Sequence, residues 1–377
     1  MSRYTIQIVE PFYTGSHRQW AEGWQQHSQH DIQILSLPGR HWKWRMYGGA
    51  VTLAQRFAQQ DRYPDLLVFS DMVDVTTFLA LTRKYSTAIP TAMYCHENQI
   101  TYPWSPTDAD VALQRNNQYG FLNYTSALAV DRLWFNSEYH LHSFTDALPD
   151  FLRQFPDYRG IDRVATIRKK SRVLSLGMDL QRLAIYRPTD RSPNDAAVIL
   201  WNHRWEYDKQ PRPFFELLFR LKDEGIDFQL VVLGASYQQQ PSIFAEARRR
   251  LADRLIHYGY APDLGTYARL LWQSDVLPVT SQQDFFGGSV VEAIFCQTFP
   301  LLPHRLAYPE HIPEALQARH LYNDERELYE KLKSFLIHYP QSNALKEEQQ
   351  NFVVGYDWST LADEYDSRAS RLIALFS

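Results

Sequence analysis

Two cations lie close together in the segment Trp201-Asn-His-Arg-Trp-Glu-Tyr-Asp-Lys209. The segment follows an expected strand at 197–201 and leads into a helix expected over 213–222. Arg204 offers a planar fork of donors, Lys209 offers a point charge, and the helix N-terminus adds its dipole. The alternative is a solvated charge cluster, which the two adjacent tryptophans disfavour. The segment therefore predicts a site that grips a diphosphate from two sides.

A second polar loop has the sequence Asp284-Phe-Phe-Gly-Gly-Ser-Val-Val-Glu292 and lies between an expected strand and an apolar helix. Because Gly287 and Gly288 have no Cβ, their backbone N–H groups could approach a hydroxylated ligand closely. Glu292 lies one to two turns into the helix, where its carboxylate could accept both hydroxyls of a ribose. The alternative is an acid favoured by the helix dipole. That alternative does not account for both acids and the glycine pair together.

The loop Glu10-Pro-Phe-Tyr-Thr-Gly-Ser-His17 opens a helix that we expect to begin near Arg18. Backbone amides around Gly15 and the helix dipole would favour a bound anion there. An ordinary strand–helix turn with Ser16 as the N-cap is the alternative.

His96 follows an expected strand at 91–95 and precedes Glu97 and Asn98. A histidine beside a carboxylate and an amide at the end of a strand is a candidate substrate contact or proton shuttle. The alternative is a structural His–Glu pair.

Asp108 and Asp110 have the Asp-x-Asp form of a metal–nucleotide site. They precede a helical run, so acids at a helix start explain them more simply. The sequence contains no GxGxxG, GxxxxGK[ST], HExxH or GxSxG motif, which argues against a classical dinucleotide dehydrogenase, a P-loop ATPase, a zinc protease and a serine hydrolase. Cys95 and Cys296 are the two cysteines, too few for a disulfide framework or a Cys-rich zinc site. We expect neither a metal nor another cofactor.

Short apolar segments alternate with segments of helical periodicity, a pattern typical of parallel sheets covered on both faces. The expected strands are 6–9, 32–35, 66–70, 91–95, 132–135, 172–176, 197–201, 228–233, 256–258, 276–279 and 299–302. We predict an α/β protein of two Rossmann-like, doubly wound domains that face each other across a cleft. The expected parts are an N-terminal domain (1–177), a linker (178–195), a C-terminal domain (196–355) and a helix that returns to the N-terminal domain (356–377).

The composition fits a chain of two domains. Its 377 residues are 45% hydrophobic and 22% charged. A chain of this length is too long to fold around one ordinary hydrophobic core. Lys+Arg of 39 against Asp+Glu of 43 gives a net charge of −4, which excludes a globally basic nucleic-acid binder but not a local basic patch. No apolar run approaches the ~18–20 residues of a membrane helix. We expect a cytoplasmic protein with no membrane partner.

Several segments together resemble known glycosyltransferases. Arg204-x4-Lys209, followed by an acid-x7-Glu pattern that ends at Glu292, resembles the retaining nucleotide-sugar glycosyltransferases of the GT-B architecture. Narrower strings over about residues 5–310 resemble the tRNA-queuosine α-mannosyltransferases. These strings are Ile8-Val-Glu-Pro-Phe-Tyr-Thr-Gly-Ser-His17, Leu37-Pro-Gly-Arg-His-Trp-Lys-Trp-Arg45, Tyr94-Cys-His-Glu-Asn-Gln-Ile-Thr-Tyr-Pro103, Asn117-Gln-Tyr-Gly120, Phe135-Asn-Ser137 and His203-Arg-Trp-Glu-Tyr-Asp-Lys209.

The resemblance implies GDP-mannose as donor and, as acceptor, the cyclopentenediol of queuosine at the wobble position of aspartate tRNA. It implies that Arg204 and Lys209 neutralise the donor diphosphate and that Glu292 binds its ribose. His96 corresponds to the histidine near the transferred sugar. The first acid of the pattern, usually Glu in such enzymes, is Asp284 here. The predicted catalytic residues are His96, Arg204 and Lys209, and the predicted donor-binding residues are Gly15, Arg204, Lys209, Asp284, Phe286, Gly287, Gly288 and Glu292.

The segment Arg40-His-Trp-Lys-Trp-Arg45 packs three cations and two tryptophans into six residues. Aromatic faces stack on unpaired bases while cations meet phosphates, which is how single-stranded loops are held. The alternative is that both tryptophans belong to the core and the charges line the surface. The residues that we assign to the tRNA acceptor are His17, Arg40, Trp42, Lys43, Trp44, Arg45 and Asn98.

Two other functions are compatible with these residues. One is the same chemistry on a glycolipid or polysaccharide, for which the mixed helix expected at 325–338 is poorly suited. The other is a catalytically silent tRNA- or nucleotide-binding protein on the same fold. The presence of Arg204, Lys209 and Glu292 argues against a silent protein.

Because cationic side chains and helix N-termini can supply the charge that a departing diphosphate needs, we expect glycosyl transfer to survive EDTA. The measurement is the transfer rate before and after chelation, with Mg²⁺ or Mn²⁺ added back. A rate that collapses in chelator and returns with either ion would make Asp108 and Asp110 metal ligands instead.

Overall fold

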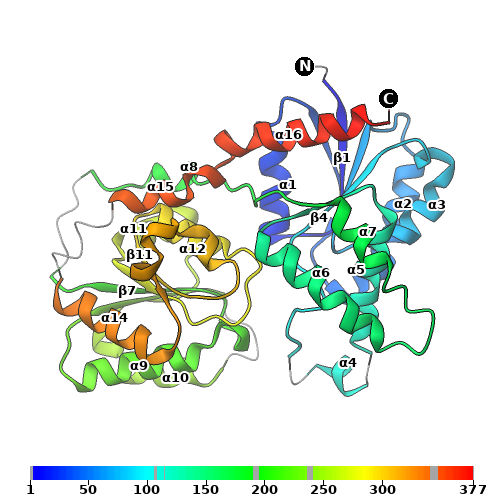
Figure 1. The fold of residues 1–377 in the computed structure, drawn as a ribbon. Coiled ribbons are helices and arrows are strands. Elements are labelled where there is room, and N and C mark those ends of the chain that lie inside the picture. Colours follow the sequence, from blue (N-terminus) through cyan, green and yellow to red (C-terminus); the bar gives the residue numbers. More distant parts are fainter. Residues whose placement is uncertain are drawn as a thin grey trace. The chain divides into compact units, whose positions relative to one another are not determined.

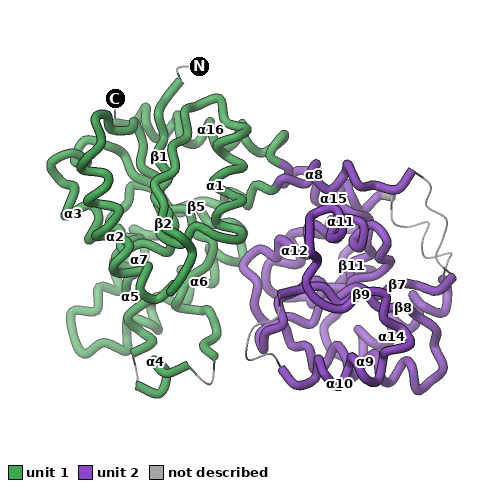
Figure 2. Tube along the Cα trace, turned by 180° about the vertical axis from the view of Figure 1, so that it is seen from behind, with its two compact units in different colours: residues 1–178, 358–377 green, residues 179–357 purple. Residues whose placement is uncertain are grey.

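The computed structural model describes residues 3–105, 108–113, 115–189, 195–235, 241–339 and 347–376. The chain forms two compact units, which we call unit 1 (residues 1–178 and 358–377) and unit 2 (residues 179–357) (Figure 2). Each unit contains a six-stranded parallel sheet with helices packed around it (Figure 1). The predicted α/β class is therefore confirmed.

The sheet of unit 1 has the strand order β2-β1-β3-β4-β5-β6. Its strands are β1 (Thr5–Tyr13), β2 (Asp31–Pro38), β3 (Leu66–Ser70), β4 (Thr91–Cys95), β5 (Arg132–Phe135) and β6 (Ser171–Val173). Every residue of β3 and β4 is buried, as expected of continuous apolar strands covered on both faces. The chain goes from β1 outward to β2 on one side, then returns to build β3 to β6 on the other.

The helices of unit 1 are α1 (Gly15–His27), α2 (Trp42–Ala58), α3 (Val75–Ser86), α4 (Ala109–Ala112), α5 (Asn117–Ala129), α6 (Glu138–Arg153), α7 (Arg163–Lys170) and α16 (Trp358–Ala374). The last of these comes from the end of the chain and packs beside α1 (Figure 1). Trp358 is buried against Gly23 and Gly177, where a Cβ would lie 1.9 and 2.4 Å from its indole. Only glycine at these two positions leaves room for the ring, which fixes α16 on unit 1.

The sheet of unit 2 has the strand order β12-β11-β10-β7-β8-β9. Its strands are β7 (Val198–Asn202), β8 (Gln229–Leu233), β9 (Leu255–Gly259), β10 (Val276–Pro278), β11 (Phe299–Pro303) and β12 (Leu321–Tyr322). Its α-helices are α8 (Gln181–Ala184), α9 (Pro211–Asp223), α10 (Ile243–Arg250), α11 (Leu264–Gln273), α12 (Gly288–Phe295), α13 (Gln317–His320), α14 (Glu325–Ile337) and α15 (Gln350–Val353).

The sequence analysis missed β12, because a two-residue strand is too short to show a periodicity. Strand β6 begins at Ser171 and ends at Val173, where we expected 172–176. Helix α1 begins at Gly15, earlier than the expected start near Arg18.

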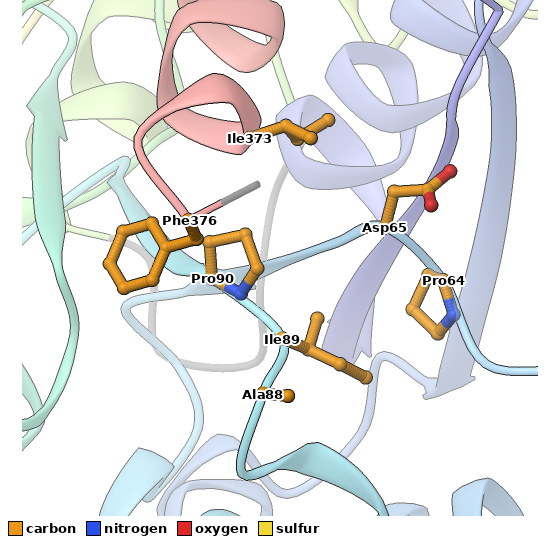
Figure 3. A pocket seen from close by; sticks show the side chains of 7 residues that line it. All are labelled: Pro64, Asp65, Ala88, Ile89, Pro90, Ile373 and Phe376. Atoms are coloured by element: carbon orange, nitrogen blue, oxygen red, sulfur yellow. The ribbon is translucent and has the colours of Figure 1, made fainter.

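Unit 1 has a small hollow away from the carboxyl ends of its strands (Figure 3). Its lining residues are Pro64, Asp65, Ala88, Ile89, Pro90, Ile373 and Phe376. Its volume is about 190 Å³, below the roughly 300–1,000 Å³ of small-molecule sites. The hollow is therefore too small for an ordinary small-molecule site. Within the described residues, no helix is both long and apolar enough to cross a bilayer.

Candidate active site

Lys209 ends a short 3-10 helix, Tyr207–Lys209, that follows β7, and its side chain is buried. Its Nζ lies 2.9 Å from Oδ1 of Asp284 and 3.3 Å from Oδ2 of Asp208, and it also donates to the carbonyl of Gln283. A buried ammonium is stable only where carboxylates or carbonyls replace its water. The predicted Lys209 and Asp284 therefore meet directly, from loops after β7 and β10.

Asp284 is held on both oxygens, since its Oδ2 accepts a hydrogen bond from the Tyr308 hydroxyl. Burial by itself would raise the pKa of this carboxyl, but the charge of Lys209, the nearby His203 and the bond from Tyr308 together lower it. His203 is buried too, and burial lowers its pKa to about 4. At neutral pH the loop after β10 therefore carries a carboxylate, and the loop after β7 carries a neutral imidazole.

Arg204 differs from Lys209 in its exposure. Its side chain is 48% exposed and lies 3.3 Å from Glu206. An ion pair with this much water around it is weak, so the guanidinium can exchange Glu206 for an anionic ligand at small cost. Of the two predicted diphosphate-binding cations, Arg204 is the accessible one, while Lys209 is enclosed by acids.

Glu292 lies on α12 and both of its oxygens have partners. Arg182 on α8 donates to Oε1 at 2.7 Å and the Tyr267 hydroxyl donates to Oε2 at 2.6 Å. Asn202, the last residue of β7, donates to the Tyr267 hydroxyl at 2.9 Å. Each carboxylate oxygen can accept a second bond, so a carboxylate fixed in this way can still receive ligand hydroxyls.

Gly287 caps α12 with a φ of 86°, in the left-handed region that favours glycine. A Cβ there would also lie 3.1 Å from the Tyr308 ring, so backbone and space both require glycine. Gly288 is the first residue of α12. Phe286 is buried against His311 and Tyr356, and its carbonyl accepts from His311 at 2.6 Å. The Phe286 side chain thus packs in unit 2 and anchors the glycine loop.

In unit 1, Glu10 of β1 and His17 of α1 form a buried pair, with Oε2 and Nδ1 2.8 Å apart. The His17 ring lies 4.1 Å from the His96 ring, centroid to centroid. Asp71, which follows β3, accepts the backbone N–H of His96 at 2.6 Å. The predicted His17 and His96 are therefore neighbours, and two acids stand beside them.

Glu10, His17 and His96 place possible ligand atoms within 4.8 Å of one another. The direct Glu10–His17 hydrogen bond, however, needs a proton between those two atoms, and a metal would have to displace that proton. We assign the group as a hydrogen-bonded cluster and not as a metal site.

Gly15, the first residue of α1, has a φ of 51°. The N-cap is Thr14, and within the described structure its side chain makes no capping bond. The alternative that Ser16 caps the helix is therefore wrong, and the start of α1 keeps backbone amides for a ligand.

Asn98 is buried, and its Oδ1 accepts from the backbone of Ile100 and Thr101 at 3.1 and 2.9 Å. Its Nδ2 has no hydrogen-bond partner among the described atoms. Asn98 thus shapes the loop after β4 and retains one donor for a ligand.

The segment 40–45, which we predicted to hold tRNA, leads into α2 and contains both exposed and packed side chains. Trp44 is 64% exposed and Arg40 is exposed, whereas Trp42 packs against Trp104 and Tyr119. Arg45 donates through Nε to the carbonyl of Pro38 at 3.1 Å. The alternative that both tryptophans belong to the core is therefore confirmed for Trp42. It is wrong for Trp44, whose ring is exposed.

Lys43 lies 2.5 Å from both Asp108 and Asp110. Asp108 also caps α4 by accepting the backbone N–H of Asp110 at 2.9 Å, as the helix-start interpretation predicted. The two acids thus serve a cap and an ion pair. They also neutralise the central cation of the segment.

Eight residues of these clusters were given no role by the sequence analysis: Glu10, Asp71, Arg182, Asn202, His203, Asp208, Tyr267 and Tyr308. Arg182 is 110 positions from Glu292, and Tyr308 is 24 from Asp284. Such separations give no local spacing signal. Glu10, Asn202, His203 and Asp208 stood inside motifs already singled out.

Replacing Lys209 by Ala would leave the buried Asp208 and the largely buried Asp284 as two carboxylates without their cation. We expect the free energy of unfolding at neutral pH to fall by about 3 kcal/mol, the scale of breaking one partner out of a buried ion pair. Urea unfolding measures this fall. Arg212→Ala is the control, because its pair with Glu216 is largely exposed and worth at most about 1 kcal/mol. Equal stability of the two variants would contradict the buried-pair assignment.

Each of the two units matches a known protein family. Residues 5–178 match the family model described as tRNA-queuosine alpha-mannosyltransferase N-terminal, and residues 185–352 match glycosyl transferases group 1. Among solved structures, sucrose-phosphate synthase from Thermosynechococcus elongatus has a TM-score of 0.70 at 14% identity, covering 99% of this chain and 100% of that one. An Escherichia coli trehalose-6-phosphate protein bound with UDP-2-fluoro glucose has a TM-score of 0.67 at 13% identity, covering 98% and 99%. These likenesses show the GT-B fold.

A closer relative is the tRNA-queuosine alpha-mannosyltransferase of Drosophila melanogaster. It is 32% identical over 342 residues, which cover 88% of this chain and 86% of the relative. With the GT-B fold and the clusters at the strand ends of both units, this places the chain in the tRNA-queuosine alpha-mannosyltransferase family.

Proposed function

We propose that this protein transfers mannose from GDP-mannose to the cyclopentenediol of queuosine in the anticodon of aspartate tRNA, with retention of configuration. The observation that carries the proposal is the extended identity with a relative named as a tRNA-queuosine alpha-mannosyltransferase. The GDP-linked donor and the aspartate tRNA are what the family resemblance implies. The glycosyltransferase match of residues 185–352 supports a nucleotide-sugar donor site on unit 2, and the family match of residues 5–178 supports a tRNA site on unit 1.

In this proposal the donor diphosphate binds at the end of β7. Arg204 is half exposed and exchanges Glu206 for phosphate oxygens, while Lys209 keeps Asp284 in place. Backbone amides at the start of α12 add donors, and Glu292, oriented by Arg182 and Tyr267, accepts the ribose hydroxyls. Asp284 takes the sugar hydroxyls.

The chemistry then follows from charge. The bond between the anomeric carbon and the phosphate oxygen breaks, and negative charge grows on the leaving GDP, where Arg204 stabilises it. The acceptor hydroxyl bonds to the anomeric carbon on the same face and its proton passes to the departing phosphate oxygen. The step therefore needs no carboxylate base, unlike hydrolysis by a pair of carboxylates.

Incubation of the protein with labelled GDP-mannose and queuosine-containing aspartate tRNA, followed by nucleoside mass analysis, tests the proposal. We expect a hexose mass on queuosine and none on tRNA that carries guanine at that position. A thermal shift with GDP but not UDP would support the guanine nucleotide. Transfer only from a UDP-sugar, or only to a non-RNA acceptor, would contradict the proposal.

Arg204→Ala removes the accessible cation of the donor site. We expect turnover to fall on the order of 10²-fold, the scale of one lost transition-state donor, with the melting temperature unchanged because the side chain is half exposed. Steady-state kinetics of Arg212→Ala supply the control, since that residue pairs with Glu216 on the exposed face of α9. Wild-type turnover of Arg204→Ala would remove the assignment.

Trp44 and Trp42 form a matched pair for the acceptor side. Trp44→Ala should weaken tRNA binding by about 1–3 kcal/mol, if the exposed ring stacks on a base, and leave stability intact. Trp42→Ala should lower the melting temperature instead, because that ring packs against Trp104 and Tyr119. Binding isotherms and melting curves separate the two. A Trp44→Ala protein that binds queuosine tRNA as tightly as wild type would show that this ring is not part of the RNA site.

A further inference from the structure

The Glu10–His17 pair has a geometry that a packing role does not require. Glu10 is fully buried, and His17 is 7% exposed on the first turn of α1. Besides the contact with His17, Glu10 accepts the backbone N–H of Phe12 through Oε1 at 2.7 Å. Both oxygens are thus directed, one at an amide and one at an imidazole. A buried carboxylate held in this way stabilises a proton on the imidazole that it faces.

His96 has the opposite environment. It is buried and its Nε2 has no hydrogen-bond partner within the described part of the chain. Its ring touches the rings of His17, Trp20 and Tyr94. Within the described part of the chain, its Nε2 has no hydrogen bond to a carboxylate that could stabilise a positive charge, and the neighbouring ring 4.1 Å away is that of another histidine, His17.

We propose that Glu10 and His17 are positioning residues that keep His96 uncharged: Glu10 holds the proton of the pair on His17, and the resulting imidazolium excludes a second proton from His96. The inference rests on the proposed function only for its kinetic readout. A neutral His96 offers a buried, unsatisfied Nε2, which a hydroxyl group of a bound substrate can meet whichever tautomer is present.

The surrounding charges agree with this division. Burial opposes a charge on His17, but Glu10 outweighs it and raises the pKa of His17 to about 9. Burial, together with the positive charge of His17 and the nearby His140, holds the pKa of His96 well below the ordinary value. The other groups that face the pair are Asp71, whose pKa burial raises to about 8, and Glu97.

The test is nitrogen NMR of the full chain labelled in histidine, titrated from pH 5 to 9.5, with His17→Asn and His96→Asn used for assignment. In the wild type we expect His17 to carry both ring protons at pH 7.5 and to lose one only near pH 9, while His96 stays neutral to below pH 6. In Glu10→Gln, His17 should be neutral at pH 7.5, because burial then acts without the carboxylate. The two rings should then share one proton, which binds with a pKa near or below the ordinary histidine pKa of ~6.5.

Kinetics supply the second readout. Wild-type kcat/KM for mannose transfer should be flat between pH 6 and 7, below the pH at which Asp71 titrates. In Glu10→Gln we expect kcat/KM to fall as the pH is lowered, by up to about tenfold at pH 5.5. At that pH a group with a pKa of ~6.5 is about nine-tenths protonated. Glu10→Asp, which keeps the charge, should restore part of the flat profile. Glu22→Gln is the control, because Glu22 pairs with Arg18 on the exposed face of α1, the helix that carries His17.

A neutral His17 or a charged His96 in the wild type at pH 7 would overturn the proposal, whatever the enzyme transfers. A Glu10→Gln variant that loses activity equally at every pH would reduce Glu10 to a structural residue. If NMR gives the expected charges but no mannose is transferred, the proposed function fails and the charge assignment stands.

Discussion

Parallel strands in one sheet end at one edge, and in each unit the strand order reverses at one point of that edge. In unit 1 the chain turns from β2 on one side of β1 to β3 on the other, and in unit 2 from β8 and β9 on one side of β7 to β10 on the other. Loops diverge at such a point and leave backbone amides and side chains uncovered by the next crossover. Glu10, His17, Asp71 and His96 gather at the first reversal, and Lys209, Asp208 and Asp284 gather at the second.

Burial gives these two clusters their chemistry. In unit 2 the ammonium of Lys209 is surrounded by acids, so the cation more accessible to a new anion is the half-exposed Arg204. In unit 1 one carboxylate and two adjacent imidazoles share a dry space, where a second positive charge is costly. Each cluster therefore has a defined charge at neutral pH, which lets it meet a ligand without first rearranging its own protons.

Supporting contacts keep the clusters in place. The Tyr308 hydroxyl and Gly287 hold the loop after β10, and a side chain at Gly287 would strike the Tyr308 ring. Arg182 and Tyr267 fix Glu292. In unit 1, α16 covers α1 from the far end of the chain through Trp24–Asp366 and Trp20–Tyr365 hydrogen bonds. The helix that carries His17 thus depends on residues some 345 positions away.

The sequence by itself determined the α/β class, most strands to within one or two residues, and the motifs around Arg204, Lys209, Asp284 and Glu292. Buried strands are continuous apolar runs, and ligand loops concentrate glycine, acids and cations at their ends, so both are local signals. It also indicated that Asp108 and Asp110 mark a helix start. Tertiary structure alone decided the strand orders, the inclusion of Arg182, Tyr267 and Tyr308, and which cations are enclosed. The sequence analysis assigned Lys43 to the tRNA and Lys209 to the donor diphosphate, yet each of these side chains faces two carboxylates in the structure. Electrostatic pairing depends on distance in three dimensions, and residues 65 or 75 positions apart leave no periodicity from which that distance could be read.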